Sequence, residues 1–197
     1  MVGAALSVAI LVVSVVYSAL HADAWAVVGC SIYGATMIAL YTVSSIYHGL
    51  REGIAKRVMQ VIDHCTIYLL IAGTYTPIML AAMRRYSPAI AWTVFGVEWG
   101  LSIVAVTLTA IDLKKYKKFS MICYIVMGWC IILAVKPTIK VLSVEGFLWV
   151  LAGGIAYTVG AIAYGVGKKV KWMHSVFHLL VIMGSLLQFF GIMFFAI

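Results

Sequence analysis

The sequence has few charged side chains. Of its 197 residues, 10% are charged and 65% are hydrophobic, and the mean hydropathy is +1.12. A soluble domain carries about a quarter charged residues. The composition therefore excludes an ordinary soluble domain and indicates an integral membrane protein.

Acidic residues and paired cysteines are also scarce. Six acidic residues stand against fourteen lysines and arginines, which gives a net charge of +8. The basic residues lie in short runs between apolar segments, so they fit attraction to anionic lipid headgroups and not a nucleic-acid partner. All four cysteines lie within hydrophobic segments and none forms a C-x-x-C pair, which excludes a disulfide framework.

Seven hydrophobic segments are present instead. Each is about the length that crosses the bilayer core as a helix, namely 20 residues, the fifth being the shortest. They run over residues 3–20, 25–49, 59–82, 88–111, 119–135, 145–165 and 173–196. The connecting segments are short, so we expect neighbouring helices to be antiparallel. The sequence thus predicts an all-α integral membrane protein, a seven-transmembrane helix bundle forming a single domain over residues 1–197.

The basic residues also predict the orientation of the spans. Ten of the fourteen follow the even-numbered spans: Arg51, Lys56, Arg57, Lys114, Lys115, Lys117, Lys118, Lys168, Lys169 and Lys171. The other side has four: Arg84, Arg85, Lys136 and Lys140. Because the more basic side faces the cytoplasm, we expect a cytoplasmic N-terminus and an outside C-terminus.

Two histidines open the last span. His174 and His178 are four residues apart, so they share one helical face and could reach the same metal ion. The H-E-x-x-H motif of metalloproteases uses this spacing, but position 175 is serine, so the glutamate base is missing. The competing interpretation is a pair of interfacial histidines solvated by headgroups.

Other polar residues are predicted at the same depth. His48 lies near the end of the second span with Ser44 four residues earlier, and Asp63 and His64 lie one turn inside the third. An even span ends on the side where the next odd span begins. We therefore expect His48, Asp63, His174 and His178 at the cytoplasmic end, in one polar site that faces the bundle interior.

The ligand types favour zinc. Three neutral imidazoles plus a water form the open arrangement of catalytic zinc sites. Asp63 would orient and deprotonate that water, whose pKa the metal lowers to about 7, and Ser44 could hydrogen-bond the water, Asp63 or a substrate oxygen. Asp63 as a direct fourth ligand is the alternative. His64 points about 100° away from Asp63 on the helix, so we expect it to be interfacial.

Together these motifs resemble the hemolysin III family. They are Ser44-x-x-x-His48, the aspartate of "IDHCTIYLLIAGTYTP" and His174-x-x-x-His178. The family is the bacterial branch of the progestin and adipoQ receptor superfamily. The resemblance implies a multi-pass plasma-membrane protein with zinc bound by His48, His174 and His178, and Asp63 near the metal through water.

The resemblance leaves two function classes. The related alkaline ceramidases imply a zinc-dependent hydrolase that cleaves a lipid amide or ester entering from the cytoplasmic leaflet, with Asp63 and Ser44 as catalytic residues. The alternative is a non-enzymatic pore, transporter or sensor whose zinc is structural. Membrane lipids are the expected partners in either case.

Two further residues within the spans stand out. Glu98 lies near the middle of the fourth span, where a carboxyl is either a functional group or a protonated acid hydrogen-bonded within the bundle. Pro77 is expected to distort the third span, and the hydroxyls of Thr74 and Thr76 could satisfy the carbonyls that it frees.

Overall fold

The computed structural model describes residues 2–166 and 172–197, apart from the side chains of residues 166 and 174. Over these residues the chain is helical and has no strand. It divides into two compact units, Met1–Leu133 and Ala134–Ile197, and each is described by itself.

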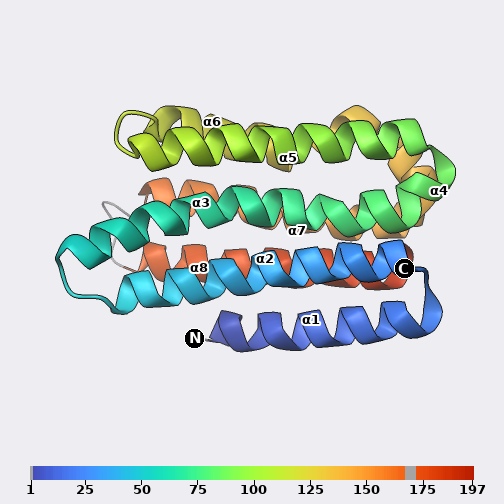
Figure 1. The fold of residues 1–197 in the computed structure, drawn as a ribbon, viewed down its shortest axis with the longest axis horizontal. Helices are drawn as coiled ribbons and strands as arrows, with labels where there is room; N and C mark the ends of the chain where they lie inside the picture. Colours follow the sequence, from blue (N-terminus) through green and yellow to red (C-terminus); the bar gives the residue numbers. More distant parts are fainter. Residues whose placement is uncertain (1, 167–171) are drawn as a thin grey trace. The chain divides into compact units, whose positions relative to one another are not determined.

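The first unit is a series of antiparallel helices. Its elements are α1 (Val2–His21), α2 (Ala24–Gly49), α3 (Ile54–Pro77), the π-helix η1 (Ile78–Met83), α4 (Arg84–Tyr86), α5 (Pro88–Ile111) and α6 (Lys117–Gly128). Figure 1 shows α1, α2, α3 and α5 side by side in chain order, and each packs against the next. The α2–α3 and α5–α6 turns lie at one end of this unit, and the α1–α2 and α4–α5 turns lie at the other.

The second unit is a helical hairpin. A 3-10 segment, η2 (Cys130–Ala134), leads into α7 (Val135–Val166), which packs against α8 (Met173–Phe195). Gly153 lets the two helices approach, because a Cβ atom there would lie 3.0 Å from the carbonyl oxygen of Gly184. A hydrogen bond of 2.7 Å between the hydroxyls of Tyr157 and Ser185 links the same helices.

Among the residues that the structure describes, six helical stretches are long and apolar enough to cross a membrane. They are Val2–His21, Ala24–Gly49, Ile54–Tyr86, Pro88–Ile111, Lys117–Gly165 and Ser175–Phe195. A helix suits this composition because it satisfies its own backbone hydrogen bonds where lipid offers none. The predicted all-helical membrane class is confirmed.

Individual boundaries agree unevenly with the prediction. The fourth predicted span matches α5 at both ends, whereas the third begins five residues late, since α3 starts at Ile54. The fifth and sixth predicted spans fall within one helical stretch, Lys117–Gly165. That stretch is interrupted at Ser143, which has a left-handed φ of 62°. The count of seven spans therefore stays a prediction.

Small residues set the distance between α2 and α3. A Cβ atom on Gly29 would lie 2.8 Å from the Cα atom of Pro77, and one on Gly73 would overlap the Thr36 hydroxyl. Glycine is thus required at both positions by close helix packing, the usual device where lipid removes the hydrophobic driving force between helices. These contacts also fix the register of the two helices.

Pro77 is followed by an irregular backbone, whereas the kink that we expected there stays a prediction. The α-helix changes to the π-helix η1 directly after it. The hydroxyls of Thr74 and Thr76 donate to the carbonyls of Leu70 and Ala72, each at 2.8 Å. They do not donate to Gly73, the carbonyl that Pro77 leaves without its usual partner, because a threonine hydroxyl reaches the residue four positions before its own.

Candidate functional site

The turn between α2 and α3 carries the first group of predicted site residues. Four residues, 50–53, join the two helices. Lys56 closes the turn, because its ammonium group donates to the carbonyl of Leu50 at 3.1 Å and lies 3.2 Å from the carboxylate of Glu52. Ser44 and His48 therefore stand on the last two turns of α2, held at a fixed distance from the start of α3.

Ser44 and His48 differ in exposure. Ser44 is half-buried, whereas His48 is exposed. The His48 ring lies 4.6 Å from the ring of Tyr47, centroid to centroid. The imidazole thus lies at the surface of this unit, near its end.

The helix register places Asp63 at nearly the same level as Ser44. Gly73 on α3 faces Thr36 on α2. Ten residues nearer the α2–α3 turn, the corresponding positions are Asp63 on α3 and Ile46 on α2. Counting in the same way from the contact of Gly29 with Pro77 gives residue 43. Since both helices rise about 1.5 Å per residue, Asp63 lies across from residues 43–46, and His48 is less than one turn beyond.

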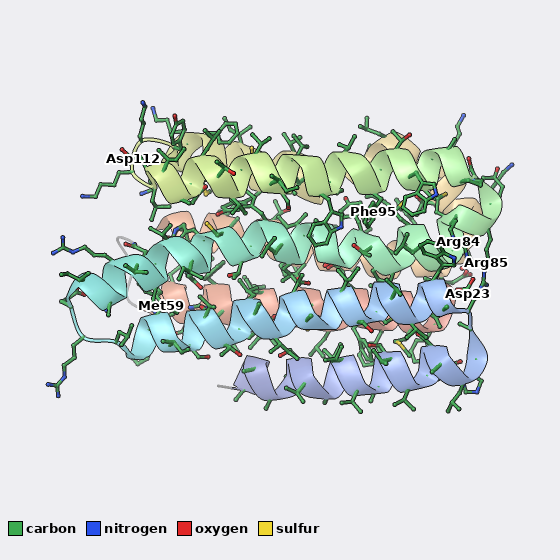
Figure 2. The ribbon with its side chains drawn as sticks, viewed as in Figure 1. Asp23, Met59, Arg84, Arg85, Phe95 and Asp112 are labelled. Atoms are coloured by element: carbon green, nitrogen blue, oxygen red, sulfur yellow. The ribbon has the colours of Figure 1, made fainter. Side chains whose placement is uncertain are left out.

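Asp63 itself is half-buried, one turn further into α3 than Met59. Figure 2 labels Met59 near the end of the unit where Asp112 also lies, opposite to the end that carries Asp23. Ser44, His48 and Asp63 thus share one end of the first unit. The side chains that could meet there are one imidazole, one carboxylate and one hydroxyl.

His64, beside Asp63, interacts with its own helix. Its Nδ1 atom lies 2.8 Å from the carbonyl oxygen of Gln60. Its backbone carbonyl accepts a hydrogen bond of 2.9 Å from the hydroxyl of Tyr124 on α6. The first contact holds the His64 ring against the preceding turn of α3, and the second links the backbone of α3 to α6.

His174 and His178 belong to the second unit. His178 is half-buried in the first turns of α8, and its ring centroid lies 5.0 Å from that of Phe177. The side chain of His174 lies outside the described residues, as do Lys168, Lys169 and Lys171. The predicted gathering of His48, Asp63, His174 and His178 therefore stays a prediction.

The donor types fit a zinc ion, although the described part of the chain holds no complete site. Imidazole nitrogen and carboxylate oxygen are zinc ligands, and the register brings one of each to the same end of α2 and α3. Among the described side chains, no group of three or more His, Cys, Asp or Glu residues could hold a metal ion. A complete zinc site would need the imidazoles of α8.

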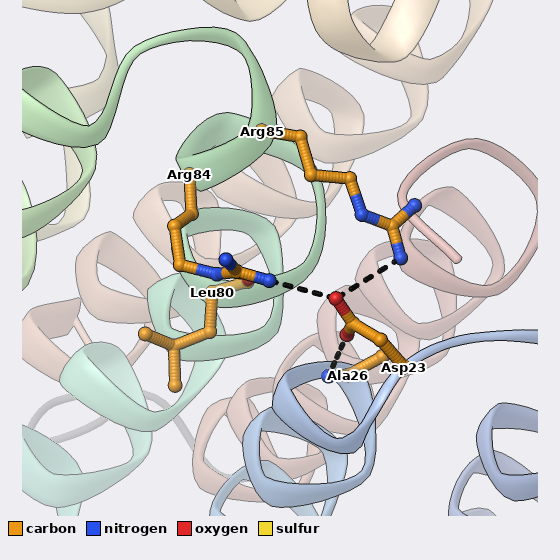
Figure 3. A network of polar contacts seen from close by, with 5 residues as sticks. All are labelled: Asp23, Ala26, Leu80, Arg84 and Arg85. Carbon is orange, nitrogen blue, oxygen red and sulfur yellow. Dashed lines mark hydrogen bonds and ion pairs between the residues drawn. The ribbon is translucent and has the colours of Figure 1, made fainter.

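A charged cluster at the opposite end of the first unit was not predicted (Figure 3). One carboxylate oxygen of Asp23 lies 2.7 Å from Nη2 of Arg84 and 3.3 Å from Nη2 of Arg85. The other oxygen caps α2 by accepting the N–H of Ala26 at 2.9 Å. Arg84 also donates from Nε to the carbonyl of Leu80 at 3.0 Å, and its guanidinium group lies 5.0 Å from the ring of Trp25.

The cluster controls the charge of Asp23. Partial burial acts to raise the pKa of this carboxyl, but the hydrogen bond from Ala26 and the two arginines outweigh it, so the pKa is lowered from 3.8. Asp23 is thus ionised at neutral pH and ties the α1–α2 turn to α4. The sequence gives one local signal for this role, since an aspartate just before a helix is a common N-cap.

The fold and composition define a multi-pass helical membrane protein. Residues 1–189 match the family described as "Haemolysin-III related". The chain is 37% identical over 196 residues to "Hemolysin-3" of Bacillus cereus, covering 100% of this chain and 88% of that protein. It is 35% identical over 196 residues to "Hemolysin-3 homolog" of Bacillus subtilis (strain 168), covering 100% and 90%.

The chain therefore belongs to the hemolysin III family, and the resemblance seen in its motifs is confirmed. A more distant relative is the human "Monocyte to macrophage differentiation factor", 23% identical over 181 residues, which cover 86% of this chain and 71% of that protein. No solved structure matches the chain.

Proposed function

We propose that the protein is a zinc-dependent hydrolase that cleaves a lipid amide or ester entering from the cytoplasmic leaflet. His48, His174 and His178 would hold the metal. The observation that carries the proposal is the placement of Ser44, His48 and Asp63 at one end of α2 and α3, as the register of the two helices requires. An ionisable side chain within a membrane-spanning segment is rare and usually marks a functional site, and Asp63 lies within α3.

The chemistry divides among these side chains. When bound, zinc supplies Lewis acidity, which polarises a carbonyl group and acidifies water. Asp63 accepts the proton of the attacking water and later returns it to the leaving group, as a general base and then a general acid. Ser44 donates a hydrogen bond to a substrate oxygen or to Asp63. Asp63 as a direct ligand is the competing arrangement.

The proposal includes seven spans with a cytoplasmic N-terminus in the plasma membrane. The stretch Lys117–Gly165 has 49 residues, and a straight helix of that length would extend about 74 Å. The hydrocarbon core is about 30 Å thick, so one crossing cannot contain it. The left-handed backbone at Ser143 is a natural place for the chain to turn between a fifth and a sixth span.

Thiol labelling in intact cells tests this topology. Tyr86 and Gly53 are both exposed and lie at opposite ends of the first unit. A membrane-impermeant thiol reagent should label Tyr86→Cys in intact cells. It should label Gly53→Cys only after the cells have been permeabilised. The reverse pattern would overturn the proposed orientation.

Two measurements on the same sample test the hydrolase. Purified wild type should contain about one zinc per chain and should turn over some member of a panel of acyl and sphingoid amides. His48→Ala should lose most of the zinc. Asp63→Asn should keep the zinc and lose about a hundredfold to ten-thousandfold in rate, whereas a direct ligand role for Asp63 predicts loss of zinc as well.

His21→Ala is the matched control. His21 ends α1 at the other end of the unit and stacks on Tyr17 with a centroid distance of 4.4 Å. It should retain both zinc and turnover. Full zinc with undiminished turnover in Asp63→Asn would remove Asp63 from the mechanism.

The second candidate is a non-enzymatic membrane protein with a structural zinc. The names of the two Bacillus relatives contain the word hemolysin, which favours a lytic pore. A zinc-loaded protein that cleaves no lipid of the panel but releases a dye from sealed vesicles would support this candidate over the hydrolase.

A further inference from the structure

Glu98 is a carboxyl group buried midway along a membrane-spanning helix. It lies ten residues, or about 15 Å, from the start of α5 at Pro88, and its side chain is fully buried. Both carboxyl oxygens lack a hydrogen-bond partner among the described residues. An ionised carboxylate near the centre of a bilayer is unfavourable without a partner, and such residues usually serve a function.

Three elements of the first unit converge around Glu98. The neighbouring residue on α5, Trp99, donates from its indole nitrogen to the hydroxyl of Thr76 on α3 at 3.1 Å. Cys130, at the start of η2, is a neighbour of the carboxyl. Residues 75–77, 98–99 and 128–131 therefore lie at one level.

The hydroxyl of Tyr75 joins two of these elements. It donates to the carbonyl of Gly128 at 3.1 Å and accepts the N–H of Ile131 at 3.0 Å. Both backbone groups lie where α6 changes to η2. Tyr75 thus satisfies the backbone groups of a broken helix.

The backbone is irregular on two sides of the same level. α3 becomes a π-helix after Pro77, and α6 gives way to a 3-10 segment at Cys130. Non-helical backbone at membrane depth is tolerated where it is buried in protein or lines a cavity, and π-helical turns are frequent at functional sites. Two such interruptions beside one unpartnered carboxyl indicate a constructed polar site.

The available ligands decide what the site can hold. A metal cation would need several oxygen ligands. The Tyr75 hydroxyl is already engaged as donor and acceptor, and the Thr76 hydroxyl donates to Ala72 and accepts from Trp99. A thiol is a poor ligand for hard cations. A proton needs one carboxyl oxygen and nothing more.

We propose that Glu98 is a proton-binding site in the membrane interior, separate from the predicted zinc site. On release, the O–H bond of the acid breaks, the electron pair stays on the carboxylate oxygen, and the proton passes to a water molecule. On uptake the same atoms move in reverse. Among the titratable groups of α3, η1, α4, α6 and η2, those that interact with the carboxyl are Tyr75 and Cys130.

Infrared difference spectroscopy of the protein in lipid vesicles tests the proposal. The carbonyl stretch of a protonated carboxylic acid is separate from the amide bands. Exposed carboxyls titrate near pH 4, so they do not contribute between about pH 5 and about pH 9. Wild type should show one acid band that is present at the lower pH and lost at the higher.

Glu98→Gln should abolish the band, and the matched control Glu52→Gln, which removes an exposed carboxyl, should leave it unchanged. If Glu98→Gln does not fold, Glu98→Asp keeps the acid on a shorter side chain and should move the band.

An acid band that persists unchanged to about pH 9 would overturn the proposal, because Glu98 would then be a permanently neutral structural acid. Absence of the band throughout the range would overturn it as well. The zinc proposal fails or holds independently, because the band should be the same in His48→Ala and in chelated wild type, whose zinc content and turnover are measured separately.

Discussion

The Asp23 cluster provides the sharpest test of the first unit, because its variants separate three interactions. Asp23→Asn removes the charge and keeps an N-cap, since asparagine and aspartate cap helices about equally well. Asp23→Ala removes both. The difference between these variants measures the cap of α2, and the difference between Asp23→Asn and wild type measures the ion pairs.

The structure sets the expected magnitudes. The pair with Arg84 is short, 2.7 Å, with side chains 23% and 34% exposed, so its loss should cost about 0.5 to 1 kcal/mol. The pair with Arg85 is 3.3 Å long, and the arginine is 52% exposed, so about 0.3 kcal/mol is expected. The cap contributes about 1 kcal/mol. Asp23→Asn should therefore cost about 1 kcal/mol and Asp23→Ala about 2 kcal/mol.

Loss of Arg84 should lower the free energy of unfolding more than loss of Arg85, although the two arginines are adjacent in the sequence. Arg84→Gln also removes the bond to the Leu80 carbonyl and the cation–π contact with Trp25. It should cost about 1.5 to 2.5 kcal/mol, whereas Arg85→Gln should cost about 0.3 kcal/mol. The ion-pair part should shrink in about 1 M salt, where the Debye length is about 3 Å.

Unfolding in detergent micelles, followed by tryptophan fluorescence, measures these differences. Trp25 reports on the cluster, because it lies against Arg84 and edge-on to Trp92 at 5.7 Å. Equal losses for Arg84→Gln and Arg85→Gln, or for Asp23→Asn and Asp23→Ala, would refute the assignment of separate roles.

The pH dependence has a definite sign. The pKa of Asp23 is lower in the folded protein than its usual value of 3.8. Its contribution is therefore complete above about pH 4 and is lost as the pH falls through the lowered pKa. Asp23→Asn should reduce the acid sensitivity of the protein in that window and leave its behaviour near neutral pH parallel to wild type.

Two further predictions concern helix packing and the metal. Gly29→Ala should be strongly destabilising, because the new Cβ atom would meet the backbone of Pro77, which cannot rotate away as a side chain could; Gly100→Ala, at a position with open space, should be neutral or slightly stabilising in the same unfolding assay. If the protein binds the proposed zinc ion, a strong chelator should lower the unfolding temperature of wild type and leave His48→Ala unchanged, because a metal bound to the folded state alone stabilises that state. Identical melting of wild type with and without its metal would contradict that role.

The all-helical membrane class and the position of some spans could be predicted from the sequence. Lipid enforces runs of about 20 apolar residues, so composition alone locates helices such as α5 to the residue. The family could be predicted from three short motifs that occur in the family's order. Polar side chains within apolar spans are few, so these motifs are easy to recognise. A disturbance of the helix at Pro77 could also be expected from the local sequence, since proline lacks the N–H group that an α-helix requires.

The contacts between distant segments could not be predicted. Asp23 and Arg84 are 61 residues apart, and the side chains around Glu98 come from α3, α5 and η2. The meeting of Asp23 with Arg84 depends on the register of α2 against the helix that begins at Ile54, which Gly29 and Gly73 set through close approach. Hydropathy reports how deep a residue lies along its own helix. It does not report which face of that helix turns toward a neighbour, because that is decided by the packing of all the helices together.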